Sequence, residues 1–497
     1  MPAKRSLTLA LALLLVAAIP ARGATFPAIT VVDTIRPGVD SSMALWGKGR
    51  LGDYLYFGAD DGVNGYELWR TNGTSTTMVA DINLAFGSAS SPYGFTAFGE
   101  WLYFAAADAT EGSELWRTNG TTTVLFADIN TTGGTGSSDP GGFTALGDWL
   151  YFSATQGDGD RELWRTNGTT TNRVSDIRPG NDSSNPEYLT ALGDWLYFAA
   201  DNGTIGNELW RTNGTTTEIV ENINTSDSGA SSSYPNNLTA LGDWLYFRAD
   251  DGLIGSELWR TNGTTTEIVE DINTLASGGS DAYDFTAFGG YLYFQANDVT
   301  HGSELWRTNG TTTELVEDMN TSDSGAGGSY PYDFTTLGDW LYFRADDGLV
   351  GSELWRTNGT STNRVADINS GVDSSYPRHF TTFGDHLHFT ANDSTDIGKT
   401  WRVNAAGVVE SLVLPGTNAY IDCMCDNAYT ALGGRLFAAF SSNETGNEIA
   451  YFDDPNVGLP ETSRDGSAWS VTLALLAALT AVAGVGIRLR RKGLSPN

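Results

Sequence analysis

One octapeptide, ELWRTNGT, occurs seven times with almost no change in this chain, starting at residues 67, 114, 162, 208, 257, 304 and 353. Its tryptophans, together with the tryptophan of a degraded copy at 399–404, are 46 to 49 residues apart. A period of this length is typical of propellers and solenoids, in which each repeat is one structural unit. The 497 residues can therefore form one long body of stacked units and need not be divided into several domains.

One period, taken from Phe143, contains four short segments with strand preference. They are FTAL at 143–146, WLYF at 149–152, ELWRT at 162–166 and TTNRVSDI at 170–177. Gly147 and Asp148 join the first two segments. Asn-Gly lies between the last two and predicts a two-residue type I′ hairpin turn, which would place Arg165 opposite Thr170.

No segment of the body has helical periodicity, and four short antiparallel strands repeated about every 47 residues predict a β-propeller. Strands like WLYF begin nine times, at residues 53, 100, 148, 194, 243, 290, 339, 385 and 434. The sequence therefore predicts an all-β fold, a single closed propeller of about nine four-stranded blades. Such blades bury nearly continuous apolar strands, so we expect the repeated tryptophans to lie in the core. An open β-solenoid is the alternative.

The two ends of the repeat array complement each other. A copy of the fourth strand, VVDTIRPG at 31–38, precedes every other strand, and the last unit stops after EIAYFDD at 448–454. One strand is therefore spare at the start and one is missing at the end. We expect the N-terminal strand to complete the last blade and close the ring, which would remove two exposed sheet edges.

The two ends of the chain predict export and anchoring. Residues 1–24 have the layout of a signal peptide, with a basic start, an apolar run and small residues at the end. The repeat body is expected at 25–457, a linker at 458–468, a transmembrane helix at 469–487 and a basic cytoplasmic tail at 488–497. Because positive charge stays on the cytoplasmic side, the body is predicted to face outward at the cell surface.

The segment LPETS at 459–463 looks like a cell-wall sorting signal of the LPxTG kind. Ser463 stands where that pattern has Gly, so a permanent membrane anchor is the simpler interpretation. Cys423 and Cys425 are the only cysteines, too few for a disulfide framework, and we expect them to have a local structural role.

The charge of the chain restricts its partners. The formal net charge is −32, from 28 basic and 60 acidic residues. Seven of the basic residues flank the two hydrophobic ends, which leaves 21 against 60 and a net charge of about −39 on the outer body. This field repels nucleic acid and anionic membrane surfaces, whereas it suits cations, basic partners or a salty medium.

A specific site needs positions at which the repeat is not symmetric. The residue before each inner-strand Phe or Leu varies in this way: Gly94, Gly142, Tyr188, Asn237, Asp284, Asp333 and His379. If the inner strands line a central channel, Asn237, Asp284, Asp333 and His379 form a polar arc at its mouth. These four are the candidate binding residues, here called the channel-mouth arc. Carboxylates beside a histidine could also perform acid/base chemistry, but the chain has no GxSxG, HExxH or phosphate-loop motif, and no catalytic residue is assigned.

Acidic turns follow the WLYF strands and are candidate calcium-binding sites. The candidate ligands are Asp60, Asp61, Asp250, Asp251, Asp346 and Asp347. Calcium takes six to eight oxygens, and each turn offers only two or three from side chains, so turn formation is the competing explanation. His386 and His388 could share a metal from one strand face, but no third ligand is seen and altered packing is favoured. Calcium is the only cofactor considered.

Each octapeptide also contains an N-G-T sequon. The candidate glycosylation sites are Asn72, Asn119, Asn167, Asn213, Asn262, Asn309 and Asn358. Exposed hairpin tips could carry glycans, although turn chemistry alone also predicts Asn-Gly.

The octapeptide resembles the ELWxxDGT repeat of large secreted and surface proteins of bacteria, sometimes called hyalin-like. Seven nearly intact copies and a degraded eighth extend over roughly residues 28–456. This chain has Asn where the family pattern has Asp, which keeps the turn and introduces the sequons. The resemblance implies an extracellular repeat protein associated with adhesion or matrix, and it supplies no catalytic residues.

We therefore expect a non-enzymatic, surface-anchored propeller that binds extracellular protein, glycan or cations, with weak contacts summed by multivalency. One alternative is a propeller hydrolase or lyase that acts on extracellular polysaccharide at the channel mouth. Another is a passive surface-layer component. Replacing Asp284, Asp333 and His379 would distinguish the enzyme from the other two hypotheses, because the replacement would abolish turnover only in an enzyme.

Overall fold

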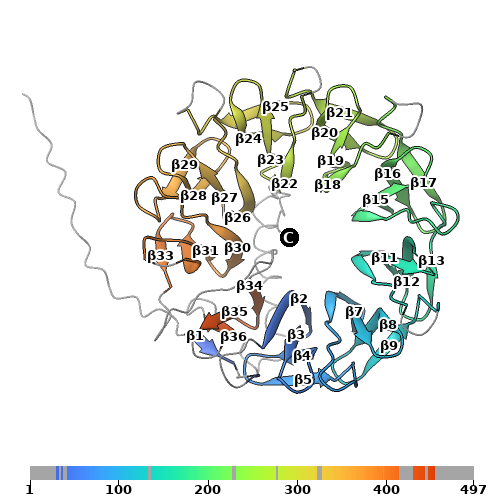
Figure 1. The fold of residues 1–497 in the computed structure, drawn as a ribbon. Helices are drawn as coiled ribbons and strands as arrows, with labels where there is room; N and C mark the ends of the chain where they lie inside the picture. The colour runs from blue at the N-terminus through green and yellow to red at the C-terminus, as the bar shows by residue number, and fades with distance from the viewer. Residues whose placement is uncertain are drawn as a thin grey trace, which may run out of the picture.

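The computed structural model describes residues 29–32, 35–36, 42–132, 136–157, 159–226, 231–275, 278–321, 327–395, 397–412, 429–442 and 446–453. In this part of the chain, nine four-stranded antiparallel sheets are arranged radially around a central axis (Figure 1). The described residues contain strands and turns but no α-helix. The prediction of an all-β propeller with nine four-stranded blades is confirmed.

Eight blades follow one another along the chain, each with its strands in sequence order from the axis outward. Blade 1 consists of β2 (Met43–Leu51), β3 (Tyr54–Asp60), β4 (Tyr66–Thr71) and β5 (Thr76–Ala80), and blade 2 of β6 (Tyr93–Phe98), β7 (Trp101–Asp108), β8 (Gly112–Thr118) and β9 (Thr123–Ala127). Blade 3 consists of β10 (Gly141–Leu146), β11 (Trp149–Gln156), β12 (Asp160–Thr166) and β13 (Thr171–Arg173). Blade 4 consists of β14 (Glu187–Leu192), β15 (Trp195–Asp201), β16 (Asn207–Thr212) and β17 (Thr217–Glu221). Blade 5 consists of β18 (Asn236–Leu241), β19 (Trp244–Asp250), β20 (Ser256–Thr261) and β21 (Thr266–Glu270), and blade 6 of β22 (Tyr283–Phe288), β23 (Tyr291–Asp298), β24 (Gly302–Thr308) and β25 (Thr313–Glu317). Blade 7 consists of β26 (Tyr332–Leu337), β27 (Trp340–Asp346), β28 (Ser352–Thr357) and β29 (Thr362–Ala366). Blade 8 consists of β30 (Arg378–Phe383), β31 (His386–Ala391), β32 (Lys399–Asn404) and β33 (Val409–Ser411).

The ninth sheet combines strands from both ends of the described chain. It contains β34 (Tyr429–Leu432), β35 (Arg435–Ser442) and β36 (Gly446–Asp453), and β1 (Ile29–Val31) pairs antiparallel with β36. The register places Thr30 opposite Tyr451. Apolar side chains of this sheet, among them Phe437, share a core cluster with Phe57 of blade 1.

The predicted signal peptide (1–24), linker (458–468), transmembrane helix (469–487), basic tail (488–497) and both cysteines lie outside the described residues. Among the residues that are described, none belongs to a helix long and apolar enough to cross a membrane.

The core consists of the apolar faces of neighbouring blades packed against each other. In the cluster between blades 4 and 5, Tyr197 and Leu209 of one blade contact Leu245 and Phe247 of the next, and each is at most 2 % exposed. Equivalent clusters recur around the ring, with the tryptophans of the octapeptide packed against them. Burying aromatic and aliphatic side chains between blades supplies the main driving force, because no single four-stranded sheet can cover both its faces.

The glutamate of the octapeptide has a structural role that sequence reasoning did not assign. In blade 4, the Glu208 carboxylate accepts the backbone N–H groups of Ile223 and Ser233 at 3.0 Å each and the Ser233 hydroxyl at 2.6 Å. Both oxygens of the carboxylate are therefore engaged. Ile223 follows the fourth strand and Ser233 precedes the first strand of the next blade, so this one side chain fixes both ends of the linker.

Corresponding hydrogen bonds from linker residues are found around the ring at eight glutamates, all at most 1 % exposed, although not every one engages both oxygens and the serine hydroxyl. They are Glu67, Glu114, Glu162, Glu208, Glu257, Glu304, Glu353 and Glu448. Burial raises the pKa of Glu208, Glu257 and Glu304 to about 7, against the opposing effect of the serine and backbone hydrogen bonds. Burial likewise raises the pKa of the other octapeptide glutamates from Glu67 to Glu353.

The arginine of the octapeptide links each blade to the next. The guanidinium of Arg211 lies 4.2 Å from the ring centre of Trp195 in its own blade and donates at 2.7 Å to the Gly263 carbonyl in the following blade. Gly263 has a φ of +84°, and a Cβ there would overlap the Arg211 guanidinium. The WLYF tryptophans therefore serve as stacking platforms for structural arginines, and the glycine is required for both its conformation and its lack of a side chain.

The hairpin after the octapeptide differs from the predicted turn. Thr166 pairs with Thr171 and Arg165 with Asn172, so the loop contains four residues. The predicted pairing of Arg165 with Thr170 is therefore wrong by two residues on the second strand. The Oδ1 atom of Asn167 accepts the N–H groups of residues 169 and 170 at 3.0 and 2.9 Å. These side-chain hydrogen bonds stabilise a wider loop than the type I′ turn, in which both central residues need positive φ.

Replacing one linker glutamate tests its role. Glu208→Gln keeps the size but provides one acceptor oxygen where two are used, and its NH₂ group would face a backbone N–H. We expect unfolding to be easier by about 2–4 kcal/mol. The matched control is Glu218→Gln in the same blade, whose side chain is 41 % exposed and pairs with Arg211; it should cost less than about 1 kcal/mol. Thermal unfolding of both variants tests this prediction. An equal loss of stability in the two variants would contradict the structural role of Glu208.

The buried glutamates also predict how stability depends on pH. Their pKa rises from 4.5 to about 7 on folding at Glu208, Glu257 and Glu304, so the folded state holds more protons than the unfolded state between these values. This contribution to stability is complete below pH 4.5 and is lost as the pH rises through 7. At constant ionic strength, the unfolding temperature should be higher at pH 5 than at pH 8. An unfolding temperature that stays constant or rises from pH 5 to pH 8 would contradict this prediction.

Candidate functional site

The first strand of each blade faces the central axis, and in blades 1 to 8 its pairing with the second strand is interrupted by a register shift. In blades 2 to 8 the first strand contains one extra residue at this point, a β-bulge; in blade 5, for example, the pairing shifts by one residue between Asn236 and Thr239. The residues inside the bulge include those that sequence analysis singled out as variable: Gly94, Gly142, Tyr188, Asn237, Asp284, Asp333 and His379. All seven have φ between 54° and 70°. Gly, Asn and Asp tolerate this left-handed conformation best, so backbone geometry explains part of the sequence pattern.

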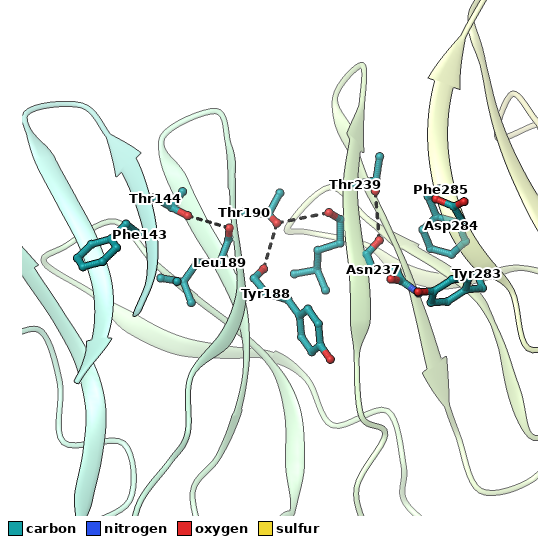
Figure 2. Close-up of a pocket in the computed structure, with 12 residues that line it drawn as sticks. Phe143, Thr144, Tyr188, Leu189, Thr190, Asn237, Thr239, Tyr283, Asp284 and Phe285 are labelled. Atoms are coloured by element: carbon teal, nitrogen blue, oxygen red, sulfur yellow. Dashed lines mark hydrogen bonds between the residues drawn. The ribbon is translucent and has the colours of Figure 1, made fainter. Parts of the chain in front are cut away.

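A first pocket, of about 460 Å³, lies along the inner strands of blades 3 to 6 (Figure 2). Its lining includes Tyr188, Asn237, Tyr283 and Asp284. Threonine hydroxyls tie the neighbouring inner strands together beneath it: Thr144 donates to the Leu189 carbonyl at 3.0 Å and Thr190 to the Leu238 carbonyl at 3.4 Å. These hydrogen bonds hold together the inner strands that carry the pocket-lining residues.

A second pocket, of about 630 Å³, continues the first along blades 6 to 8. It is lined by Tyr283, Asp284, Gln295, Tyr332, Asp333, Phe334, Thr335, Arg378, His379 and Phe380. Tyr283 and Asp284 line both pockets, so the two are adjacent. The structure therefore brings the four residues of the channel-mouth arc together: Asn237 lines the first pocket, Asp333 and His379 line the second, and Asp284 lines both.

Asp284 links two blades. Its carboxylate accepts the backbone N–H of Asp333 in the next blade at 2.6 Å. Burial raises the pKa of Asp284, although the backbone N–H groups of Asp333 and Phe334 act in the opposite direction. The His379 Nδ1 atom lies 3.0 Å from the Thr390 hydroxyl in the adjacent strand of its own blade. These contacts make both side chains part of the framework that holds the bulges in place.

Tyrosines are the site residues that sequence analysis missed. Tyr188 and Tyr283 line the pockets and are 51 % and 50 % exposed. Tyr234, Tyr330 and Tyr376 are at least 50 % exposed and have a φ of 47° or 48°, directly before the prolines that lead into inner strands. These three tyrosines belong to the tripeptide Ser-Tyr-Pro of the linkers and line neither pocket, so this repeated tripeptide does not identify Tyr188 and Tyr283.

The oxygens of the candidate calcium ligands are used by their own turns. Asp60 accepts the N–H of Gly62 and pairs with Arg36 at 2.6 Å. Asp61, Asp251 and Asp347 each accept two N–H groups two and three residues later, and Asp250 and Asp346 each accept one. Turn formation therefore accounts for these aspartates, and calcium binding stays a prediction.

Another acidic group, in blade 3, places carboxylate oxygens within 4.8 Å of one another. It consists of Asp160, Glu162 and Asp176 and is the one such group of three among the described residues. Arg173 pairs with Asp160 at 2.6 Å and lies 3.6 Å from Asp176, while the Glu162 oxygens accept linker hydrogen bonds. The local positive charge and these hydrogen bonds explain the cluster without a metal.

His386 and His388 are packed in the core, 8 % and 2 % exposed. The ring of His388 contacts Phe383, Tyr429 and Phe452 with centroid distances of 6.1 to 6.4 Å. Burial lowers the pKa of His388 to about 3, with the charges of His386 and Arg402 acting in the same direction. The interpretation of these histidines as altered packing, which sequence analysis favoured over a shared metal, fits this environment.

Six of the seven sequon asparagines are exposed at hairpin tips, and Asn72 is half-buried. Each asparagine accepts N–H groups of the two residues that follow the glycine, as Asn262 does from Thr264 and Thr265 at 2.9 Å each. The turn explains why asparagine is present, and glycosylation stays a prediction.

Comparison with known proteins adds little beyond the fold. No family model matches this sequence, and no curated protein is similar to it. The computationally designed Ika8 protein has 13 % sequence identity and a TM-score of 0.40, with coverage of 73 % of this chain and 96 % of that one. A puromycin-hydrolyzing peptidase of Mycobacterium tuberculosis has 10 % identity and a TM-score of 0.37, and the match spans 74 % of this chain but only 62 % of the peptidase. The GH74 xyloglucanase of Xanthomonas campestris has 11 % identity and a TM-score of 0.33, with coverage of 86 % and 80 %. Similarities this low give no indication of activity.

Proposed function

We propose that this protein is a non-enzymatic surface scaffold that binds extracellular glycan along the channel-mouth arc and the tyrosines beside it. The observation that carries the proposal is the pair of adjacent pockets on blades 3 to 8. Their volumes, about 460 and 630 Å³, are in the range of ligand sites, and together they suit an extended ligand.

The chemistry of the lining supports a sugar. Tyr188 and Tyr283 present half-exposed rings that can stack on the apolar face of a sugar and still hydrogen-bond through their hydroxyls. Asn237, Asp333 and Gln295 provide acceptors and donors for sugar hydroxyl groups. Because the inner strands are braced by threonine hydrogen bonds, little ordering is needed on binding.

A hydrolase or lyase is the second candidate, favoured by Asp284, Asp333 and His379 lining one pocket. Against it, the Asp284 carboxylate already accepts the N–H of Asp333, which makes it a poor acceptor for a substrate proton. Polysaccharide cleavage that is lost in Asp333→Asn would support the enzyme. Surface location is part of the proposal and depends on the predicted N-terminal signal and C-terminal anchor, both outside the described residues.

The proposed scaffold includes closure of the ring by the N-terminal strand, supported by the pairing of β1 with β36. Deleting residues 29–32 should lower the unfolding temperature and speed amide exchange in β36, because that strand would become an edge. The control is deletion of the preceding residues 25–28. Equal behaviour of the two deletions would contradict closure.

The test of binding uses the full-length protein, in detergent, on a glycan array with calcium and with chelator. For a glycan that binds, Tyr283→Ala should weaken binding by about tenfold, because Tyr283 lines both pockets. The control is Tyr330→Ala, which removes a tyrosine that is 59 % exposed but lines neither pocket. Absence of binding to every glycan, or equal loss in both variants, would overturn the proposal. Loss of binding in chelator would assign a role to calcium.

A further inference from the structure

Arg344 in β27 lacks an ionic partner among the described residues. The centre of its guanidinium lies 3.6 Å from the ring centre of Tyr332 and 5.6 Å from that of Tyr376. Its Nε atom is buried without a hydrogen bond, and no carboxylate within the described chain pairs with it. A half-buried cation held between two aromatic rings is costly to leave unpaired, even with cation–π attraction.

An equivalent arginine two blades earlier shows what is missing. Arg248 occupies the same position in β19 and pairs at 2.5 Å with Asp281, the residue that follows the linker serine of the next blade. The residue at that position beside Arg344 is Tyr376. The chain therefore has an aromatic ring beside Arg344 at the position where Arg248 has the carboxylate of Asp281.

A second arginine without an ionic partner in the described chain lies nearby. Arg378 is exposed, lines the second pocket and precedes His379 of the channel-mouth arc. The Tyr376 ring, whose centre is 5.6 Å from the Arg344 guanidinium, is two residues before Arg378 in the chain, which places the two arginines near each other. Burial is the main cause that lowers the pKa of Arg344 to about 10; the charge of Tyr376 opposes this shift and that of Arg378 adds to it. In a chain with a net charge of −32, two adjacent uncompensated arginines form a local positive site.

We propose that the second pocket is a subsite for an acidic sugar residue, whose carboxylate or sulfate group pairs with Arg378 in the positive field of Arg344. The sugar ring lies against Tyr332 and Tyr283, which line the same pocket. Arginine suits a planar carboxylate or a sulfate because it offers two parallel N–H donors. This inference rests on the proposed function, since it names the class of glycan that the arc recognises.

The charges around the pocket restrict the ligand further. Asp284 and Asp333 also line the pocket, and the outer body as a whole is strongly acidic. A polyanion with a charge on every residue would be repelled by this field, whereas one acidic residue in an otherwise neutral oligosaccharide would meet this repulsion once and could offset it by pairing with Arg378. We therefore expect a sparsely charged glycan.

The experiment compares oligosaccharides that differ only in one terminal residue. Backbones of xylotriose, cellotriose and chitotriose carry a terminal glucuronate, glucose or glucose 6-sulfate. Binding to the full-length protein is measured by calorimetry at low and at high salt. We expect one of the acidic forms to bind about tenfold more tightly than its glucose counterpart, with a preference that shrinks at high salt. The two acidic arms distinguish a carboxylate from a sulfate.

Three matched variants locate the effect. Arg378→Gln should reduce the preference for the acidic form about tenfold and leave binding of the glucose form nearly unchanged. Arg344→Gln should reduce the preference by a smaller factor, because its guanidinium lies behind Tyr332. Arg248→Gln removes the paired arginine of blade 5 and should leave the preference unchanged. Because the readout is a ratio of two affinities, a general loss of folded protein does not mimic the result.

The outcomes separate this inference from the proposed function. If neutral oligosaccharides bind in a Tyr283-dependent way but acidic forms have no advantage, the acidic subsite is wrong and the glycan scaffold stands. A preference that persists in Arg378→Gln would also overturn the subsite. If no oligosaccharide binds, both proposals fail.

Discussion

In eight of the nine blades, the structure depends on a buried carboxylate that accepts hydrogen bonds from the linker that follows the blade. Linkers in this chain are rich in Gly, Ser and Asp and have little apolar surface with which to fix their own course. The glutamate at the start of ELWRTNGT holds the residue after the fourth strand and the serine before the next inner strand. Because that serine is followed within four residues by the inner-strand bulge, the same hydrogen bonds determine where the pocket-lining residues lie.

The scaffold is nearly symmetric and the candidate site is not. Eight of the nine blades use the same buried glutamate, and most use the same core tyrosine and interblade arginine, so these positions cannot encode a specific ligand. Variation near the site includes the bulge and the residue after the linker serine, where left-handed backbone restricts the choice but does not fix it, and the second-strand position of Arg248 and Arg344. The contrast between Arg248 with Asp281 and Arg344 with Tyr376 shows how a single change at such a position turns a structural ion pair into an uncompensated charge.

The sequence predicted the fold well because one pattern was repeated. Strand preference, turn residues and period agree in every unit, so an error in one copy is corrected by the others. The hairpin after the octapeptide was predicted less well: Asn-Gly indicated a two-residue turn, whereas the Asn167 side chain stabilises a four-residue loop. The site was found only in part, since the four polar residues of the arc stand out against the repeat, but the tyrosines resemble the many aromatics of the core.

By itself, the sequence determined the number of blades, the strands in each and the residues that break the repeat, because these follow from local preference and periodicity. Only the tertiary structure decided which residues 15 to 52 positions apart lie side by side, since that depends on the course of the linkers and the packing of whole blades. The buried glutamates, the arginine on the next blade's glycine and the two adjacent arginines at the second pocket all belong to this second class. Each is a contact between a charged group and a distant part of the chain, and nothing in local sequence specifies such a partner.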